Sequence, residues 1–287
     1  MNCLKYNVLV FSLVSIMCLM VLFAGNQAPA TSPSQNTQAS TLPNQEQDQV
    51  LGTTDEAPVF YNAWDCFNYA YNIYKNGKGF QSKCVQSVNN TYGIEQKIYV
   101  DKYKNANGDC YVTQTSVGAE NFFEAIYASG DQVSTKRYDG AVSYPKVPEN
   151  LTERSYSVAD YLATDRMLPG EFTFKISKTT AKISGLIPNR KKGIYNFKMI
   201  LEPDAWGTRY AKYIMASADI IKELPGSKSI VLDVVVDMKS GCFLSISTTE
   251  NYTIKALGLS VDCTSVSSEV FSKMDYDVNI SSVNLFK

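Results

Sequence analysis

The sequence predicts an α+β fold in which a strongly curved antiparallel sheet of about ten strands, an open half-barrel, carries two to three helices on its concave side. Three observations support this prediction. Most of the chain after residue 58 consists of strand-length segments in which apolar and polar residues alternate. Two other stretches repeat Trp, Tyr and Phe at intervals of three and four residues, which is helical spacing. One helix cannot bury such a face alone, whereas a twisted sheet of many strands curls into a surface that receives it.

The composition restricts the classes of function. The chain has 287 residues, of which 45% are hydrophobic and 19% charged, as in an ordinary globular protein. Its net charge of −1 gives no basic surplus, so we expect no nucleic-acid partner. The chain contains no histidine, which excludes Ser-His-Asp and Cys-His catalysis and every His-ligated metal site. Catalysis by paired carboxylates, Lys or Tyr stays open.

The amino-terminal segment indicates export. Residues 8–25 carry no charge and follow Lys5, so residues 1–25 are expected to be a signal peptide or an N-terminal membrane anchor. Ala28-Pro29-Ala30 suits cleavage, and an uncleaved anchor is the alternative. The large residues before Cys18 argue against lipidation there. In either case the rest of the chain should lie outside the cytoplasm, at the cell surface or secreted. If the amino-terminal segment is not cleaved, residues 8–25 would tether the protein to the membrane.

Two further regions follow this segment. Residues 26–57 are rich in Gln, Ser, Thr and Pro and nearly lack large apolar groups, so they are expected to form a disordered linker. Residues 58–287 are expected to form a single domain. The five cysteines beyond the apolar segment are odd in number, which argues against a disulfide scaffold and predicts small buried side chains: Cys66, Cys84, Cys110, Cys242 and Cys263.

The first folded element is a helix from about Tyr61 to Asn76. Four rings, Trp64, Phe67, Tyr71 and Tyr74, share one face of it, and glycines follow its end. An antiparallel meander is predicted next, over 80–88, 94–103, 110–117, 122–129 and 132–138. Asn107-Gly108 is a type I′ hairpin signal, and Gly130-Asp131 predicts another hairpin.

A short helix interrupts the strands. Ser157 and Asp160 form a capping box that starts a helix through about Met167. Strands are then predicted over 172–177, 180–187 and 194–201, followed by a second aromatic helix that begins at Pro203 and Asp204. Trp206, Tyr210, Tyr213, Ser217 and Ile221 fall on one stripe of that helix. Long strands over 229–238, 242–254 and 259–274 complete the chain.

This order of elements, with the segment LDVVVDMKSGCFLSISTTEN at 232–251, resembles the LolA-like lipoprotein-carrier fold. The resemblance covers roughly residues 58–287 and is architectural. It implies an open half-barrel with a helical lid, and family members hold acyl chains or a lipidated protein between lid and sheet. It assigns no binding residue to this chain.

The function expected from these features is non-enzymatic, extracytoplasmic binding of a hydrophobic or lipid-like ligand between the aromatic helices and the sheet. The alternatives are a cell-envelope sensor or protein-interaction module of the same fold with a packed interior, and an enzyme that uses carboxylates or Tyr. The protein partner of such a module is unknown, and no metal, cofactor or catalytic residue is expected. The candidate cavity-lining residues are Trp64, Phe67, Tyr71, Tyr74, Phe174, Phe197, Met199, Trp206, Tyr210 and Tyr213.

The carboxylates give a weaker signal. Asp233 and Asp237 lie four apart on the polar side of a predicted strand and are expected to be solvated. Glu120 and Glu124 stand beside aromatic residues, and we expect nothing unusual of them.

Overall fold

The computed structural model describes residues 57–216, 223–256 and 258–286. The predicted signal peptide or anchor, and all of the predicted linker except Ala57, lie outside the described residues. Within the described part of the chain, no helix is long and apolar enough to cross a membrane.

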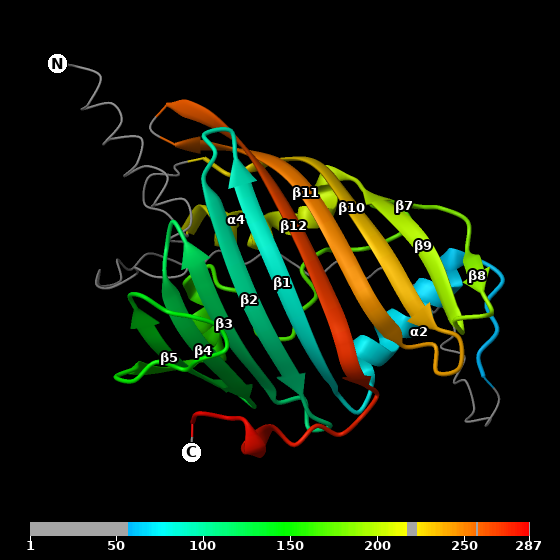
Figure 1. The fold of residues 1–287 in the computed structure, drawn as a ribbon, viewed down its shortest axis with the longest axis horizontal. Coiled ribbons are helices and arrows are strands. Elements are labelled where there is room, and N and C mark those ends of the chain that lie inside the picture. Colours follow the sequence, from blue (N-terminus) through cyan, green and yellow to red (C-terminus); the bar gives the residue numbers. More distant parts are fainter. Residues whose placement is uncertain (1–56, 217–222, 257, 287) are drawn as a thin grey trace, which may run out of the picture.

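The described residues form one open antiparallel sheet of twelve strands with helices packed on it, which confirms the predicted fold class (Figure 1). The strand order is β6-β5-β4-β3-β2-β1-β12-β11-β10-β9-β7, and β8 also pairs with β9. The strands are β1 (Phe80–Asn90), β2 (Glu95–Lys104), β3 (Cys110–Gly118), β4 (Phe122–Ser129), β5 (Gln132–Asp139), β6 (Thr152–Ser157), β7 (Ala181–Ile183), β8 (Ile187–Asn189), β9 (Ile194–Leu201), β10 (Gly226–Asp237), β11 (Phe243–Ala256) and β12 (Leu259–Met274).

The first and last strands meet in the middle of the sheet. β1 pairs antiparallel with β12 along its whole length, with Cys84 opposite Glu269. This pairing joins the amino-terminal meander of β1–β6 to the meander of β7–β12. Residues far apart in sequence therefore share one continuous surface, and the candidate site lies on it.

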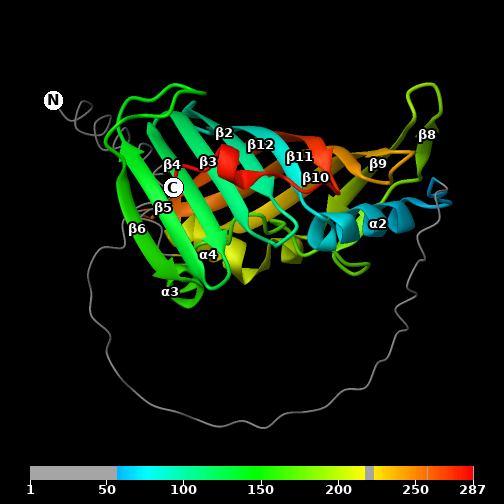
Figure 2. The ribbon, with the colours of Figure 1, turned by 90° about the horizontal axis from the view of Figure 1, so that it is seen from below.

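Helix α2 (Ala63–Asn76) confirms the predicted aromatic helix, although it begins two residues later than predicted. The side chain of Asn62 accepts a hydrogen bond from the backbone N–H of Asp65 and caps the helix. Phe67 is buried on the sheet, with its ring 5.8 Å from that of Phe243. The ring of Tyr74 stacks on that of Phe80 at 4.6 Å. The aromatic side of the helix thus faces the sheet. Figure 2 shows α2 lying against the end of the sheet that carries β9 and β10.

Helix α3 (Val158–Ala163) starts at the predicted capping box. The hydroxyl of Ser157 accepts from the backbone N–H of Asp160 and donates to its carboxylate. The six residues before it form strand β6, which the sequence did not predict because TERSYS shows no apolar alternation. As the outermost strand on its side of the sheet, β6 is largely exposed, so it has little apolar surface to bury.

The strand predicted over 172–177 does not form. Residues 166–174, here named the covering segment, cross the concave side of the sheet without regular structure. The backbone N–H of Lys175, just after it, donates to the carbonyl of Ala205 at 2.7 Å, outside any strand pairing. The rings of Phe172 and Phe174 still pack in the core. The apolar alternation at these positions therefore predicted their burial correctly, although the residues form a loop and not a strand.

The second aromatic helix is also different from its prediction. It is a 3₁₀ turn, η1 (Pro203–Trp206), followed by α4 (Gly207–Ala216). Gly207 has φ +64, which breaks the helical path between the two. The predicted continuation through Ser217 and Ile221 lies outside the described residues.

Both predicted hairpins form, but one turn type was wrong. The β4–β5 hairpin turns at Gly130-Asp131 between the paired residues Ser129 and Gln132. The β2–β3 hairpin needs the five residues 105–109, and Asn107 does not adopt the positive φ of a type I′ turn. The side chain of Asn105 accepts from the N–H groups of Asn107 and Asp109 and stabilises this longer loop.

The two faces of the sheet are covered by different parts of the chain. The main core lies on the concave face beneath α2, η1, α4 and the covering segment. On the other face, the carboxyl-terminal segment, with η2 (Ile280–Ser282), packs against Tyr111 and Phe123. All five described cysteines are free, and four are buried, as the sequence predicted.

Candidate functional site

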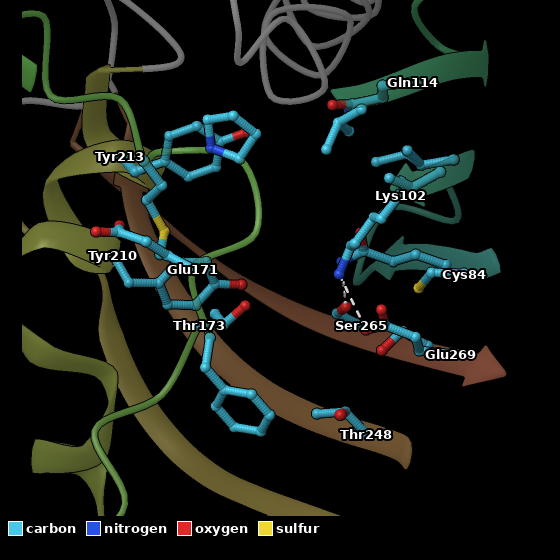
Figure 3. A pocket seen from close by; sticks show the side chains of 18 of the residues that line it. Cys84, Lys102, Gln114, Glu171, Thr173, Tyr210, Tyr213, Thr248, Ser265 and Glu269 are labelled. Atoms are coloured by element: carbon cyan, nitrogen blue, oxygen red, sulfur yellow. Dashed lines mark hydrogen bonds and ion pairs between the residues drawn. The ribbon is translucent and has the colours of Figure 1, made fainter. Parts of the chain in front are cut away.

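A cavity of about 330 Å³ lies between the concave face of the sheet and the segments that cover it. One wall consists of side chains from β1, β2, β3, β4, β10, β11 and β12. The opposite wall consists of Tyr161 from α3, the covering segment, and Tyr210 and Tyr213 from α4. Figure 3 shows Tyr210 and Tyr213 on one side and Lys102 and Glu269 on the other. The volume is at the lower end of the range of about 300–1,000 Å³ found for small-molecule sites.

The covering segment is fixed by contacts at two points. The hydroxyl of Tyr74 donates to the carbonyl of Gly170 at 3.0 Å and joins the segment to α2. Gly170 has φ +82, and a side chain there would collide with the sulfur of Cys110. The ring of Phe172 then packs edge-on against Tyr71 and Tyr74, at 5.2 and 5.6 Å. The cavity therefore has a defined roof.

The sheet wall is more polar than the sequence predicted. The ammonium group of Lys102 lies 2.9 Å from the carboxylate of Glu269, which also accepts from the hydroxyl of Ser82 at 2.6 Å. Beside this pair, the amide of Gln86 donates to Ser265 at 2.8 Å. Apolar side chains, among them Val100 and Ile246, separate these groups. Such a wall suits an amphiphilic ligand better than a purely apolar one.

Glu250 is a buried carboxyl group on the cavity wall, 4% exposed. It accepts hydrogen bonds from the indole N–H of Trp206 at 2.9 Å and from the hydroxyl of Tyr210 at 3.4 Å. Burial raises its pKa to about 7, and the two hydrogen bonds oppose that rise. Burial thus favours the neutral form of this carboxyl group more than water would.

Glu124 is a second buried carboxyl group on the wall, 1% exposed. Burial raises its pKa, and the guanidinium of Arg166, 3.2 Å away, counteracts the rise. Its Oε2 atom has no hydrogen-bond partner. The nearby Glu120 is also buried, and burial raises its pKa to about 8. The expectation that these two glutamates are unremarkable was wrong, because the fold buries both carboxyl groups.

The other pair of carboxylates behaves as predicted. Asp233 is exposed and lies 3.4 Å from Lys198 on the neighbouring strand. Asp237 accepts hydrogen bonds from Ser240 in the β10–β11 turn. Both lie away from the cavity wall.

The structure divides the ten candidate residues between the cavity and the packed core. Four of them line the cavity: Tyr74, Phe174, Tyr210 and Tyr213. The other six pack elsewhere in the main core: Trp64, Phe67, Tyr71, Phe197, Met199 and Trp206. A role in ligand binding stays a prediction for the four residues that line the cavity. Among the six core residues, Trp206 contacts a cavity-lining residue through its hydrogen bond to Glu250.

The polar lining residues were missed by the search for aromatic stripes. Strand parity held a signal for two of them. Glu250 has the same parity as Ile246, Thr248, Tyr252 and Ile254 along β11 and shares their face, and Lys102 likewise shares the face of Ile98 and Val100 along β2. For Arg166, which lies outside any strand, the sequence held no such signal.

The nucleophilic and acidic groups of the site differ in burial and in their neighbours. Burial raises the pKa of Cys84 to about 11, so its thiol is a poor nucleophile. Glu124 and Glu250 lie on β4 and β11, with β3, β2, β1 and β12 between them in the sheet. In the described part of the chain no group of three or more His, Cys, Asp or Glu is placed to hold a metal.

No protein-family model and no curated protein matches the chain. Among solved structures, it is similar to a LolA superfamily protein from Nitrosomonas europaea, with 11% identity and a TM-score of 0.28, over 78% of this chain and 97% of that chain. It is also similar to MucB in complex with MucA(peri), with 7% identity and a TM-score of 0.14, over 71% of this chain and 93% of that chain. These values describe a weak resemblance at the level of the fold and identify neither a ligand nor a partner.

Proposed function

We propose that the protein is a non-enzymatic binding protein that holds a small hydrophobic or amphiphilic ligand between the covering segment, helix α4 and the concave face of the sheet. The cavity of about 330 Å³ between these parts carries the proposal. A well-packed core leaves few voids larger than a water molecule, so a space of this size at a covered sheet face needs an explanation. A bound ligand supplies one.

The composition of the walls supports the same function. Aromatic and aliphatic side chains alternate with hydrogen-bonding groups, which is typical of sites that orient a ligand with an apolar body and a polar end. The competing proposal, an interaction module with a packed interior, fits the half of the core beneath Phe67 and Phe243. It does not explain the cavity. The extracytoplasmic setting rests on residues 8–25 and stays part of the proposal.

A cavity-filling substitution tests the function. The side chain of Thr248 points into the cavity, as Figure 3 shows, whereas the next residue, Thr249, points to the opposite face of β11. Full-length Thr248→Trp should lose binding of the neutral dye N-phenyl-1-naphthylamine, measured by fluorescence, and the matched Thr249→Trp should keep it. Thr173→Trp fills the same space from the covering segment and replaces Thr248→Trp if that variant does not fold.

Two results would contradict the proposal. The first is dye binding that is equal in all folded variants. The second is wild-type protein, purified from a lipid-rich host, that releases no small molecule on organic extraction and binds no dye; it would favour the interaction module.

A further inference from the structure

The cations that line the cavity are paired with carboxylates, whereas one of the carboxyl groups has no cation beside it in the described part of the chain. Two cations and four carboxylates line it: Lys102, Arg166, Glu124, Glu171, Glu250 and Glu269. Both cations already contact carboxylates, Lys102 with Glu269 at 2.9 Å and Arg166 with Glu124 at 3.2 Å. An anionic headgroup would therefore have to compete with a protein carboxylate for either cation.

Glu250 has neutral partners instead. Its hydrogen bonds come from an indole and a phenol, and no ion pair among the described residues includes it. A buried carboxylate without a cation is costly, and burial accordingly raises the pKa of this group to about 7. A positively charged ligand would supply the charge that this group lacks.

A second, independent observation comes from the other end of the site. Glu124 is 1% exposed, and its Oε2 atom accepts no hydrogen bond. A buried polar atom left without a partner destabilises the folded state. Glu124 thus adds a second buried carboxyl group, already paired with Arg166, to the acidic lining of the cavity.

The aromatic rings opposite the sheet have the same preference. The rings of Tyr210 and Tyr213 stack at 6.4 Å, and that of Phe174 stands edge-on to Tyr210 at 6.0 Å. Ring faces attract cations, and sites that combine aromatic rings with a carboxylate recognise ammonium groups. Tyr210 contacts Glu250 directly, so ring and carboxylate lie together.

We propose that the ligand is a small apolar amine bound in its protonated form, with its ammonium group held by Glu250 beside Tyr210, and not a fatty acid or another anionic lipid. This inference rests on the proposed function, since it requires a ligand in the cavity. A volume of about 330 Å³ limits the apolar part to one short alkyl chain or ring system.

Three probes of equal chain length test the charge preference: octylammonium, 1-octanol and octanoate. They are titrated by calorimetry into the full-length protein at pH 8, which lies above the pKa of about 7 of Glu250. Octylammonium should bind at least about tenfold more tightly than 1-octanol, because its hydrogen bond to Glu250 is charge-assisted. Octanoate should bind most weakly.

Glu250→Gln should remove most of the preference, so that the ratio of octylammonium affinity to 1-octanol affinity falls to near one. Glutamine keeps one acceptor oxygen for the indole N–H of Trp206, and its NH₂ group can donate to the hydroxyl of Tyr210, so both contacts can be kept. The matched control is Asp233→Asn, which removes the same charge from an exposed position on β10 and should change neither affinity.

Octanoate that binds as tightly as octylammonium, or a Glu250→Gln variant with unchanged octylammonium affinity, would overturn the inference. If 1-octanol binds and the preference for the amine is missing, the inference fails while the proposed function stands. If none of the three probes binds, the proposed function fails with it. Should Glu250→Gln not fold, the order of the three affinities in the wild type decides.

Discussion

The stability of this protein should depend on pH through Glu250. The pKa of this carboxyl group rises from 4.5 to about 7 because it is buried. Between pH 4.5 and about pH 7, the folded state therefore keeps a proton on Glu250 that the unfolded state has released. The stabilisation from this proton is complete below pH 4.5 and is lost as the pH rises through 7.

The magnitude follows from the two pKa values. Each tenfold change in an ionisation constant corresponds to about 1.4 kcal/mol, so the full loss for Glu250 is about 3 kcal/mol. About 2 to 3 kcal/mol of it should appear between pH 5 and pH 8. That is a large share of the free energy of unfolding, about 5–15 kcal/mol, of a typical protein.

Urea unfolding of the wild type and of Glu250→Gln at several pH values measures the effect. Glutamine cannot ionise, so the free energy of unfolding of the wild type should fall by about 2 to 3 kcal/mol relative to the variant from pH 5 to pH 8. Asp233→Asn is the control, since its side chain is exposed and its profile should follow the wild type. Parallel profiles for the wild type and Glu250→Gln would refute the conclusion that Glu250 is desolvated.

Two further predictions concern the core beneath α2. Phe67 is 1% exposed between α2 and the sheet, so Phe67→Ala should lower the free energy of unfolding by about 3–5 kcal/mol. Phe67→Asp should unfold the domain or abolish dye binding. A near-wild-type urea midpoint in both variants would show that this helix face is misassigned. Burial raises the pKa of Cys66 to about 12, so iodoacetamide should label this thiol only after unfolding, as read by mass spectrometry, and rapid labelling of the native protein would contradict its burial.

The fold could be predicted because its signals are local. The alternation of Ile230, Leu232, Val234 and Val236 with polar or less buried residues identifies β10 and its buried face without knowledge of its neighbours. The ring spacing in α2, its cap and the capping box at Ser157 act within one helical turn. Where local signals were absent or shared by two structures, prediction failed. TERSYS has no apolar pattern, and Phe172 and Phe174 alternate within a loop.

The candidate site could be predicted only in part, because apolar burial and cavity lining have the same sequence pattern. Tyr74 and Tyr71 lie on one helix face, yet the first lines the cavity and the second packs against Phe172. Which ring faces empty space depends on the path of the covering segment, and that path is fixed by long-range contacts such as the hydrogen bond from Tyr74 to Gly170.

The sequence by itself determined the antiparallel sheet, the aromatic helices on it and the absence of histidine chemistry, since these follow from the residue types and their spacing. Only the tertiary structure decided the polarity of the cavity. The pairing of β1 with β12 places Lys102 beside Glu269, and the packing of η1 on the sheet places Trp206 against Glu250. A charge is exposed or buried, paired or unpaired, according to which distant segment covers it, and that is a property of the folded chain alone.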